Sequence, residues 1–171
     1  FELGLIRNHY VGRTFIEPTQ NIRQFGVKLK HSVNVSYIKG KRIVLIDDSV
    51  VRGTTAKKIV KMIYDAGAKE VHLGVSCPPI THPDFYGIDT PSYSELIGSK
   101  KSVEEMSSII GTKSLFFLSL EGTYRAMGCE KRDNSSPQFT DHCFTGEYPT
   151  QLVDMEQGNV SKQYSLLTEK N

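Results

Sequence analysis

The chain is organised around one run, residues 42–55: Arg42-Ile43-Val44-Leu45-Ile46-Asp47-Asp48-Ser49-Val50-Val51-Arg52-Gly53-Thr54-Thr55. Its apolar beginning, Ile43 to Ile46, is typical of a strand buried on both faces of a parallel sheet. Two acids stand where that strand should end, and a small, hydroxyl-rich turn then leads into a predicted helix. Open α/β sheets bind ligands at the carboxyl ends of their strands, so we expect the ligand site here.

The turn has the features of an anion site. A loop that opens a helix presents backbone N–H groups, and the helix dipole favours a negative charge there. Gly53 allows the backbone to approach a phosphate closely, and Thr54 and Thr55 add hydroxyl donors. The acids Asp47 and Asp48 suit sugar hydroxyls or a Mg²⁺-bound ligand. The alternative is an ordinary strand–turn–helix with two solvated acids, and the Gly-Lys-Ser/Thr of a Walker loop is absent from the sequence.

Composition narrows the class of protein. The chain has 171 residues, enough for one domain with a core, and its net charge of +2 includes no basic block that would indicate a nucleic-acid or membrane surface. No apolar run approaches the ~20 residues of a membrane span, and the first residues do not resemble a signal peptide. We therefore expect a cytoplasmic protein. Its three cysteines, Cys77, Cys129 and Cys143, are too widely spaced for a disulfide framework or a CxxC metal site.

The order of elements predicts an α/β fold. Residues 42–76 have the pattern of a βαβ unit, which implies a right-handed parallel crossover, and helices are expected on both faces of the sheet. Ser102 to Glu105 form a capping box that opens a helix ending at Gly111. The remaining segments are a proline-rich loop at 77–91, a short helix at 93–97, a strand at 115–118, a short helix at 119–127 and a disordered tail at 151–171.

The run 42–55 resembles the phosphoribosyl-pyrophosphate (PRPP) binding motif of type I phosphoribosyltransferases. Further segments resemble one family among them, the glutamine-dependent amidophosphoribosyltransferases: residues 8–16, 26–30, 78–80, 85–89, 95–97 and 143–150. The resemblance covers roughly residues 1–150. It implies an open, mainly parallel sheet flanked by helices and incomplete at the N-terminus. We interpret residues 1–128 as a partial phosphoribosyltransferase domain and 129–150 as an extension packed on it.

The resemblance also implies a reaction. In that family ammonia displaces pyrophosphate from PRPP to give 5-phosphoribosylamine, the first step of purine synthesis. The ammonia comes from glutamine, hydrolysed in an amino-terminal glutaminase domain that this sequence does not include. The chain is therefore expected to belong to a longer polypeptide, to be inactive alone, and to act as a homo-oligomer inhibited by purine nucleotides.

The resemblance assigns roles to residues. Those implied to be catalytic lie in a loop that closes over the substrate: Tyr10, Arg13 and Lys30. Those implied to bind substrate are Asp47, Asp48, Ser49, Val50, Val51, Arg52, Gly53, Thr54 and Thr55. The pair Asp47 and Asp48 is also implied to hold Mg²⁺.

Some family members carry a four-iron four-sulfur cluster. Here Asp84 and Thr140 stand at positions where those members have cysteines, so Cys143 alone remains and no cluster is expected. Two alternative functions stay open. One is a different PRPP-dependent phosphoribosyltransferase, although base-specific enzymes lack the stretch Tyr10 to Ile16. The other is a non-catalytic protein of the same fold that binds PRPP or a nucleotide.

Overall fold

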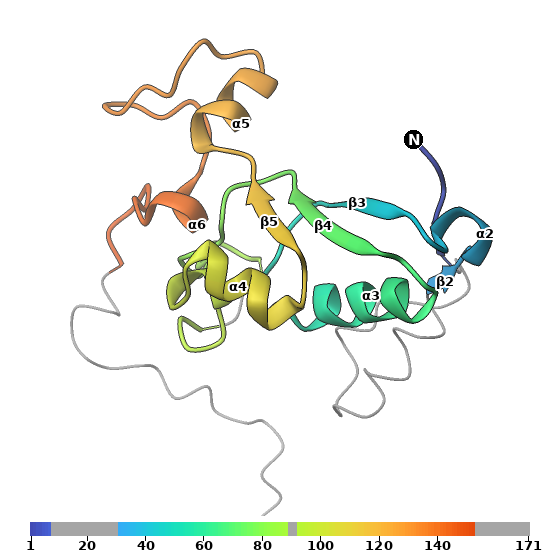
Figure 1. Cartoon of the computed structure of the whole chain (residues 1–171). Coiled ribbons are helices and arrows are strands. Elements are labelled where there is room, and N and C mark those ends of the chain that lie inside the picture. The colour runs from blue at the N-terminus through green and yellow to red at the C-terminus, as the bar shows by residue number, and fades with distance from the viewer. Residues whose placement is uncertain (8–30, 89–91, 153–171) are drawn as a thin grey trace, which may run out of the picture.

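The computed structural model describes residues 1–7, 31–88 and 92–152 (Figure 1). The loop residues Tyr10, Arg13 and Lys30 lie outside these ranges, as does nearly all of the predicted tail at 151–171. Within the described ranges, no helix is both long and apolar enough to cross a membrane.

A three-stranded parallel sheet forms the centre of the molecule. Its strands are β3 (Arg42–Asp47), β4 (Glu70–Val75) and β5 (Ser114–Phe117), in the order β3-β4-β5. The βαβ unit predicted for residues 42–76 is confirmed as a parallel pair, with Ile43 opposite Val71. Because parallel strands point the same way, all three carboxyl ends lie at one edge of the sheet.

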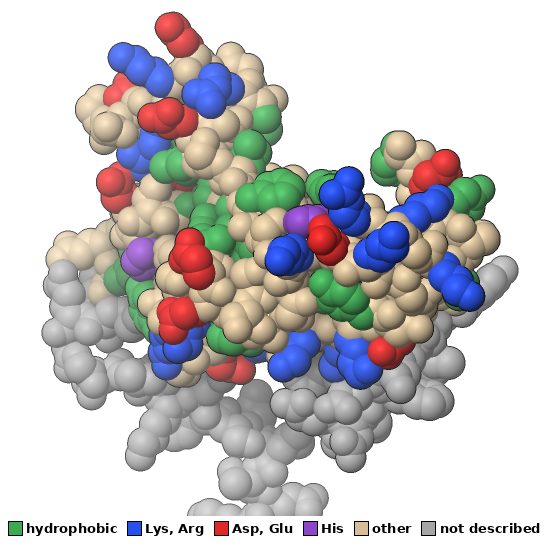
Figure 2. Space-filling view, in the orientation of Figure 1, with side chains coloured by type: hydrophobic (Ala, Val, Ile, Leu, Met, Phe, Trp, Pro, Cys, Tyr) green, Lys and Arg blue, Asp and Glu red, His purple; other side chains and the backbone are tan. Residues whose placement is uncertain are grey.

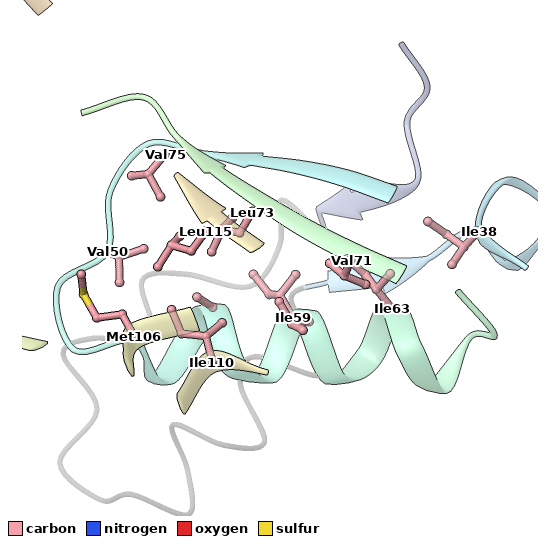
Figure 3. Packing of buried hydrophobic residues seen from close by; sticks show 12 residues of the cluster. Ile38, Val50, Ile59, Ile63, Val71, Leu73, Val75, Met106, Ile110 and Leu115 are labelled. Atoms are coloured by element: carbon pink, nitrogen blue, oxygen red, sulfur yellow. The ribbon is translucent and has the colours of Figure 1, made fainter. Parts of the chain in front are cut away.

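Two helices, α3 (Thr54–Asp65) and α4 (Val103–Ile110), cover one face of the sheet (Figure 1). The apolar positions predicted for α3 are buried, namely Ala56, Ile59, Val60 and Ile63. They meet Leu73 and Leu115 of the sheet in the core, together with residues of α4 (Figure 3). The predicted capping box is present, because Ser102 Oγ accepts the N–H of Glu105 and the Glu105 carboxylate accepts the N–H of Ser102.

The opposite face of the sheet corrects one prediction. The strand at Ile43–Ile46 was expected to be buried on both faces, yet Val44 is 61% exposed, Ile46 64% and Phe116 49%. Hydrophobic side chains are correspondingly visible on the surface over the upper side of the sheet (Figure 2). Side chains alternate along a strand, and α3 and α4 cover only the side to which Ile43 and Leu45 point. Among the described residues, helices therefore do not cover both faces.

Shorter elements complete the described chain. A two-stranded antiparallel sheet joins β1 (Leu5–Arg7) to β2 (His31–Val33), and α2 (Val35–Ile38) follows. The helix expected at 93–97 is wrong, because the structure has turns there and then a 3₁₀ helix, η2 (Ile97–Ser99). The helix expected at 119–127 is confirmed as α5 (Leu120–Ala126), capped by Ser119. The last helix is α6 (His142–Thr145).

Candidate functional site

The site predicted from the sequence lies where the strands end. Asp47 is the last residue of β3, and its carbonyl oxygen accepts the backbone N–H of Ser76, just after β4, at 3.0 Å. The N–H of Leu118, just after β5, is bonded in turn to the carbonyl of Val75 at 2.9 Å. These bonds hold the three exits from the sheet side by side. Residues of the loops after β3 and β4 therefore border one another.

The two acids have different surroundings. Asp47 is half buried, and its Oδ1 accepts the N–H of Asp48 at 3.0 Å. Burial raises the pKa of Asp47; its bond from the Asp48 N–H opposes this, and the charge of Asp48 adds to it. Asp48 is exposed, and one of its oxygens accepts the hydroxyl of Ser49 at 3.1 Å. Two adjacent carboxylates are the hard oxygen donors that Mg²⁺ prefers, so the residues present fit that ion.

Cys77 stands close to these acids at the end of β4. Partial burial and the negative charges of Asp48 and Asp47 raise the pKa of its thiol to about 11. Because this pKa lies far above 7, Cys77 is protonated at neutral pH. The reactive form of cysteine is the thiolate, so the Cys77 thiol is unreactive there. The effect of the two acids on Cys77 shows that the loop after β4 reaches the predicted site.

The loop after the acids, residues 49–55, has features that suit an anion. Gly53 is the N-cap of α3 in the left-handed region, at φ +72°, and offers no side chain to cap the helix. The first turn of α3 contains no acidic residue, so its N–H groups and the positive end of the dipole face the loop. Thr54 is exposed and Thr55 half buried beside it. This arrangement is chemically suited to a phosphate group.

Glu95 is a residue of the site that the sequence interpretation did not single out. Its carboxylate accepts Nε of Arg52 at 3.1 Å and Nη2 of Arg52 at 3.4 Å. The neighbouring Ile97 donates its N–H to the carbonyl of Val51 at 3.0 Å. The sequence placed Glu95 in the segment 95–97 that resembles the family but gave it no role, because its partner lies 43 positions away.

A second cluster of chemically active residues lies in the C-terminal part, where the structure brings together Asp84, His142 and Cys143, with ligand atoms within 4.8 Å of one another. His142 Nε2 and Asp84 Oδ1 are 2.6 Å apart, and both side chains are buried. Burial opposes ionisation of Asp84. The N–H groups of Ile88 and Tyr86 and the ring of His142 outweigh this and hold the pKa of Asp84 below its usual range.

Asp84 and Thr140, which both stand at positions where cluster-bearing family members have cysteines, have different surroundings in the structure. Asp84 lies beside Cys143, whereas the side chain of Thr140 is exposed. Burial and the charge of Asp84 raise the pKa of the Cys143 thiol. The contacts of Asp84 with its own loop and with α6 give it a structural role that the sequence did not reveal.

The fold and the site define a phosphoribosyltransferase. The family model for the phosphoribosyl transferase domain matches residues 9–104, more than half of the chain and all of the acid pair and anion loop, so the chain belongs to this family. Comparison with individual proteins narrows the similarity to one group of phosphoribosyltransferases. It is 60% identical over 168 residues to the amidophosphoribosyltransferase of Rhizobium etli, covering 98% of this chain and 34% of that protein.

Two comparisons with Bacillus subtilis agree. The chain is 53% identical over 152 residues to its amidophosphoribosyltransferase, which covers 89% of this chain and 32% of the relative. It also superposes with a TM-score of 0.73 on a solved glutamine PRPP amidotransferase from B. subtilis complexed with ADP and GMP, at 53% identity over 88% of this chain and 33% of that one. The chain thus spans about one third of the length of the relatives it matches.

Proposed function

We propose that this chain is the PRPP-binding portion of an amidophosphoribosyltransferase, in which ammonia displaces pyrophosphate from PRPP to form 5-phosphoribosylamine. The observation that carries the proposal is the joint placement of Asp47, Asp48 and the loop 49–55 at the carboxyl end of β3. The acids suit the ribose hydroxyls and the loop suits the 5′-phosphate. The similarity to amidophosphoribosyltransferases supports ammonia as the acceptor, against a base-specific enzyme of the same fold.

The charges of the reaction match those of the site. Departure of pyrophosphate from C1 builds positive charge on the ribose, which the nearby carboxylates of Asp47 and Asp48 stabilise electrostatically. The same two acids would hold Mg²⁺, which when bound would supply positive charge near the leaving group. Backbone N–H groups of the loop and the hydroxyls of Thr54 and Thr55 hold the 5′-phosphate. Tyr10, Arg13 and Lys30 are assigned to closure over the substrate, which excludes water.

The proposal extends to partners. The chain spans 34% of the Rhizobium etli relative, which leaves room in the longer protein for the proposed glutaminase domain that would supply ammonia. We further propose a cytoplasmic homo-oligomer inhibited by purine nucleotides, and the B. subtilis structure complexed with ADP and GMP supports nucleotide binding.

The absence of an iron–sulfur cluster stays a prediction. A carboxylate and a hydroxyl, Asp84 and Thr140, are poor ligands for iron–sulfur clusters, which are held by thiolates. Protein purified without oxygen should contain no acid-labile sulfide. Stoichiometric iron and sulfide would contradict this.

Calorimetric titration of the chain with PRPP, with and without Mg²⁺, tests the function. Tight, Mg²⁺-dependent binding that is lost in Asp48→Asn supports the proposal. A matched control is Asp133→Asn, an exposed acid of the C-terminal loop, which should bind as the original chain does. Binding that ignores Mg²⁺, or that survives in Asp48→Asn, contradicts the assignment of the acid pair.

A further inference from the structure

The loop 49–55, called the phosphate loop below, is bonded to the segment 95–97, which lies far away in the sequence. Two contacts reach neighbouring loop residues: the fork of Arg52 on Glu95, at 3.1 and 3.4 Å, and the hydrogen bond from Ile97 N–H to the Val51 carbonyl, at 3.0 Å. A guanidinium that meets both oxygens of a carboxylate fixes orientation as well as distance. The segment 95–97 therefore fixes both the backbone and the side chain of the loop.

The residues on either side of these contacts are also fixed. Val50 is 3% exposed, and its side chain points into the core beside Met106 and Leu115 (Figure 3). Gly53 lies against the same segment: a Cβ placed there would come within 3.1 Å of Ile97 Cδ1. Val50 thus packs in the hydrophobic core, and the Cα of Gly53 lies against Ile97. The hydroxyl-bearing residues of the loop are not fully buried: Thr54 is exposed, and Ser49 and Thr55 are half buried.

The ion pair has a consequence for charge. Arg52 is the only cationic residue between Asp47 and Ala56 in the sequence, and its guanidinium is directed to Glu95. A guanidinium already paired with a carboxylate offers little net charge to a phosphate. The attraction for the anion then comes from the backbone N–H groups and from the dipole of α3. Such groups bind well only if the loop already has the right shape before the ligand arrives.

We propose that Glu95 is a positioning residue of the phosphate loop, and that Arg52 acts through Glu95 by fixing the loop rather than by touching the phosphate. This inference rests on the proposed function, because it concerns the same site. If Arg52 and Glu95 act only as a pair, removing either side chain should weaken phosphate binding equally, and removing the second should weaken it no further.

The test is a double-mutant cycle in the 171-residue chain, with Glu95→Gln, Arg52→Gln and the double variant. One measurement is the affinity for ribose 5-phosphate by calorimetry. The other, made without ligand, is hydrogen exchange of the backbone amides of residues 49–53. The control is Glu121→Gln, because Glu121 also pairs with an arginine, Arg125, on the exposed surface of α5.

We expect each single variant to bind ribose 5-phosphate about fivefold more weakly and to exchange its loop amides faster. The double variant should match the singles, and Glu121→Gln should match the original chain. Two results would overturn the inference. One is unchanged or tighter binding in Glu95→Gln, as expected if the pair withholds Arg52 from the phosphate. The other is a further loss when Arg52→Gln is added to Glu95→Gln, as expected if Arg52 contacts the ligand.

The exchange measurement separates this inference from the proposed function. If the original chain binds no ribose 5-phosphate, the proposed function fails for this chain. Equal acceleration of loop exchange in both single variants and the double variant still supports the positioning role of Glu95. Unchanged exchange in Glu95→Gln overturns that role, whatever the ligand binding.

Discussion

The strand-end site and the C-terminal region use carboxylates in opposite ways. At the end of β3, Asp48 is exposed, and burial raises the pKa of the half-buried Asp47. In the C-terminal region Asp141 is buried, and so is Asp84 of the loop after β4, which is paired with His142 of that region. Burial opposes their ionisation, yet hydrogen bonds to both, together with Arg132 beside Asp141, hold both pKa values below the usual range.

The difference lies in where the donors come from. Asp141 receives Arg132 Nε at 2.6 Å and the hydroxyl of Tyr124 at 2.8 Å, so the protein itself satisfies that charge. Asp47 receives a backbone N–H from its neighbour Asp48, and in the proposed function a ligand would supply further partners. A carboxylate satisfied by the protein stabilises the fold, whereas one that awaits a ligand costs stability and contributes to binding.

Loss of Arg132, which pairs with the buried Asp141, should have the largest effect on the free energy of unfolding. The side chains of Arg132 and Asp141 are only 8% and 6% exposed. Arg132→Ala leaves a buried carboxylate without its cation and should lower the free energy of unfolding by about 3 kcal/mol. Urea denaturation measures this, with Arg125→Ala on the exposed face of α5 as the control. A loss no larger than that of the control would contradict the contrast between the two regions.

Asp84→Asn should lower the free energy of unfolding by about 2 kcal/mol at pH 7, because the bond to His142 loses its charge. The pKa of Asp84 is lower in the folded state than in the unfolded one. Its contribution is therefore present above about pH 4 and lost as the pH falls through the folded pKa. Thermal unfolding between pH 7 and pH 3 should show a shallower loss in Asp84→Asn. An unchanged slope would mean that this carboxyl does not govern the acid range.

The same substitution at the strand-end site should have the opposite sign for stability. The folded pKa of Asp47 is raised, so its contribution is most favourable below the unfolded pKa, near about 4, and is lost as the pH rises through the folded value. At neutral pH the ionised Asp47 costs stability, and Asp47→Asn should unfold at the same temperature or higher. The same variant should bind Mg²⁺-PRPP about tenfold more weakly, a change of ~1.4 kcal/mol. Lower stability with unchanged affinity would reverse the roles of the two regions.

The smallest effect on stability is expected from Arg52→Gln. The side chains of Arg52 and Glu95 are 39% and 51% exposed, so solvent screens the pair. The free energy of unfolding should change by about 0.5 kcal/mol or less, far below the change for Arg132→Ala. Urea denaturation of the two variants side by side checks this ratio. A comparable loss in both would show that the loop contact is part of the stabilising framework.

Local patterns in the sequence predicted a large part of this molecule. The unit from β3 through α3 to β4 was readable because its signals are contiguous: an apolar run, two acids, a turn and a helix with apolar positions at helical spacing. The capping box of α4 and its end at Gly111 were readable for the same reason. The site at the end of β3 followed from the rule that parallel strands bind ligands at their carboxyl ends.

Other features depend on residues that are distant in the chain. The fork between Arg52 and Glu95 spans 43 positions, and the pair of Asp84 and His142 spans 58. No periodicity links such residues, and each alone looks like a solvated charge. The expected helix at 93–97 failed for a related reason: Glu95 N–H makes a turn bond to the Ser92 carbonyl, and Ile97 N–H is directed to the distant Val51 carbonyl instead of to a residue one helical turn earlier.

The sequence by itself determined the class of fold, the parallel βαβ unit and the identity of the acids and the anion loop, because these are encoded in neighbouring residues. Only the tertiary structure decided which face of the sheet is covered and which carboxylates are paired with other groups of the protein. Burial and pairing depend on the neighbours that folding supplies, and these set the opposite pKa shifts of Asp47 and Asp84. The same residue type therefore has a raised pKa at the strand ends, where binding is proposed, and a lowered pKa where the protein itself satisfies its charge.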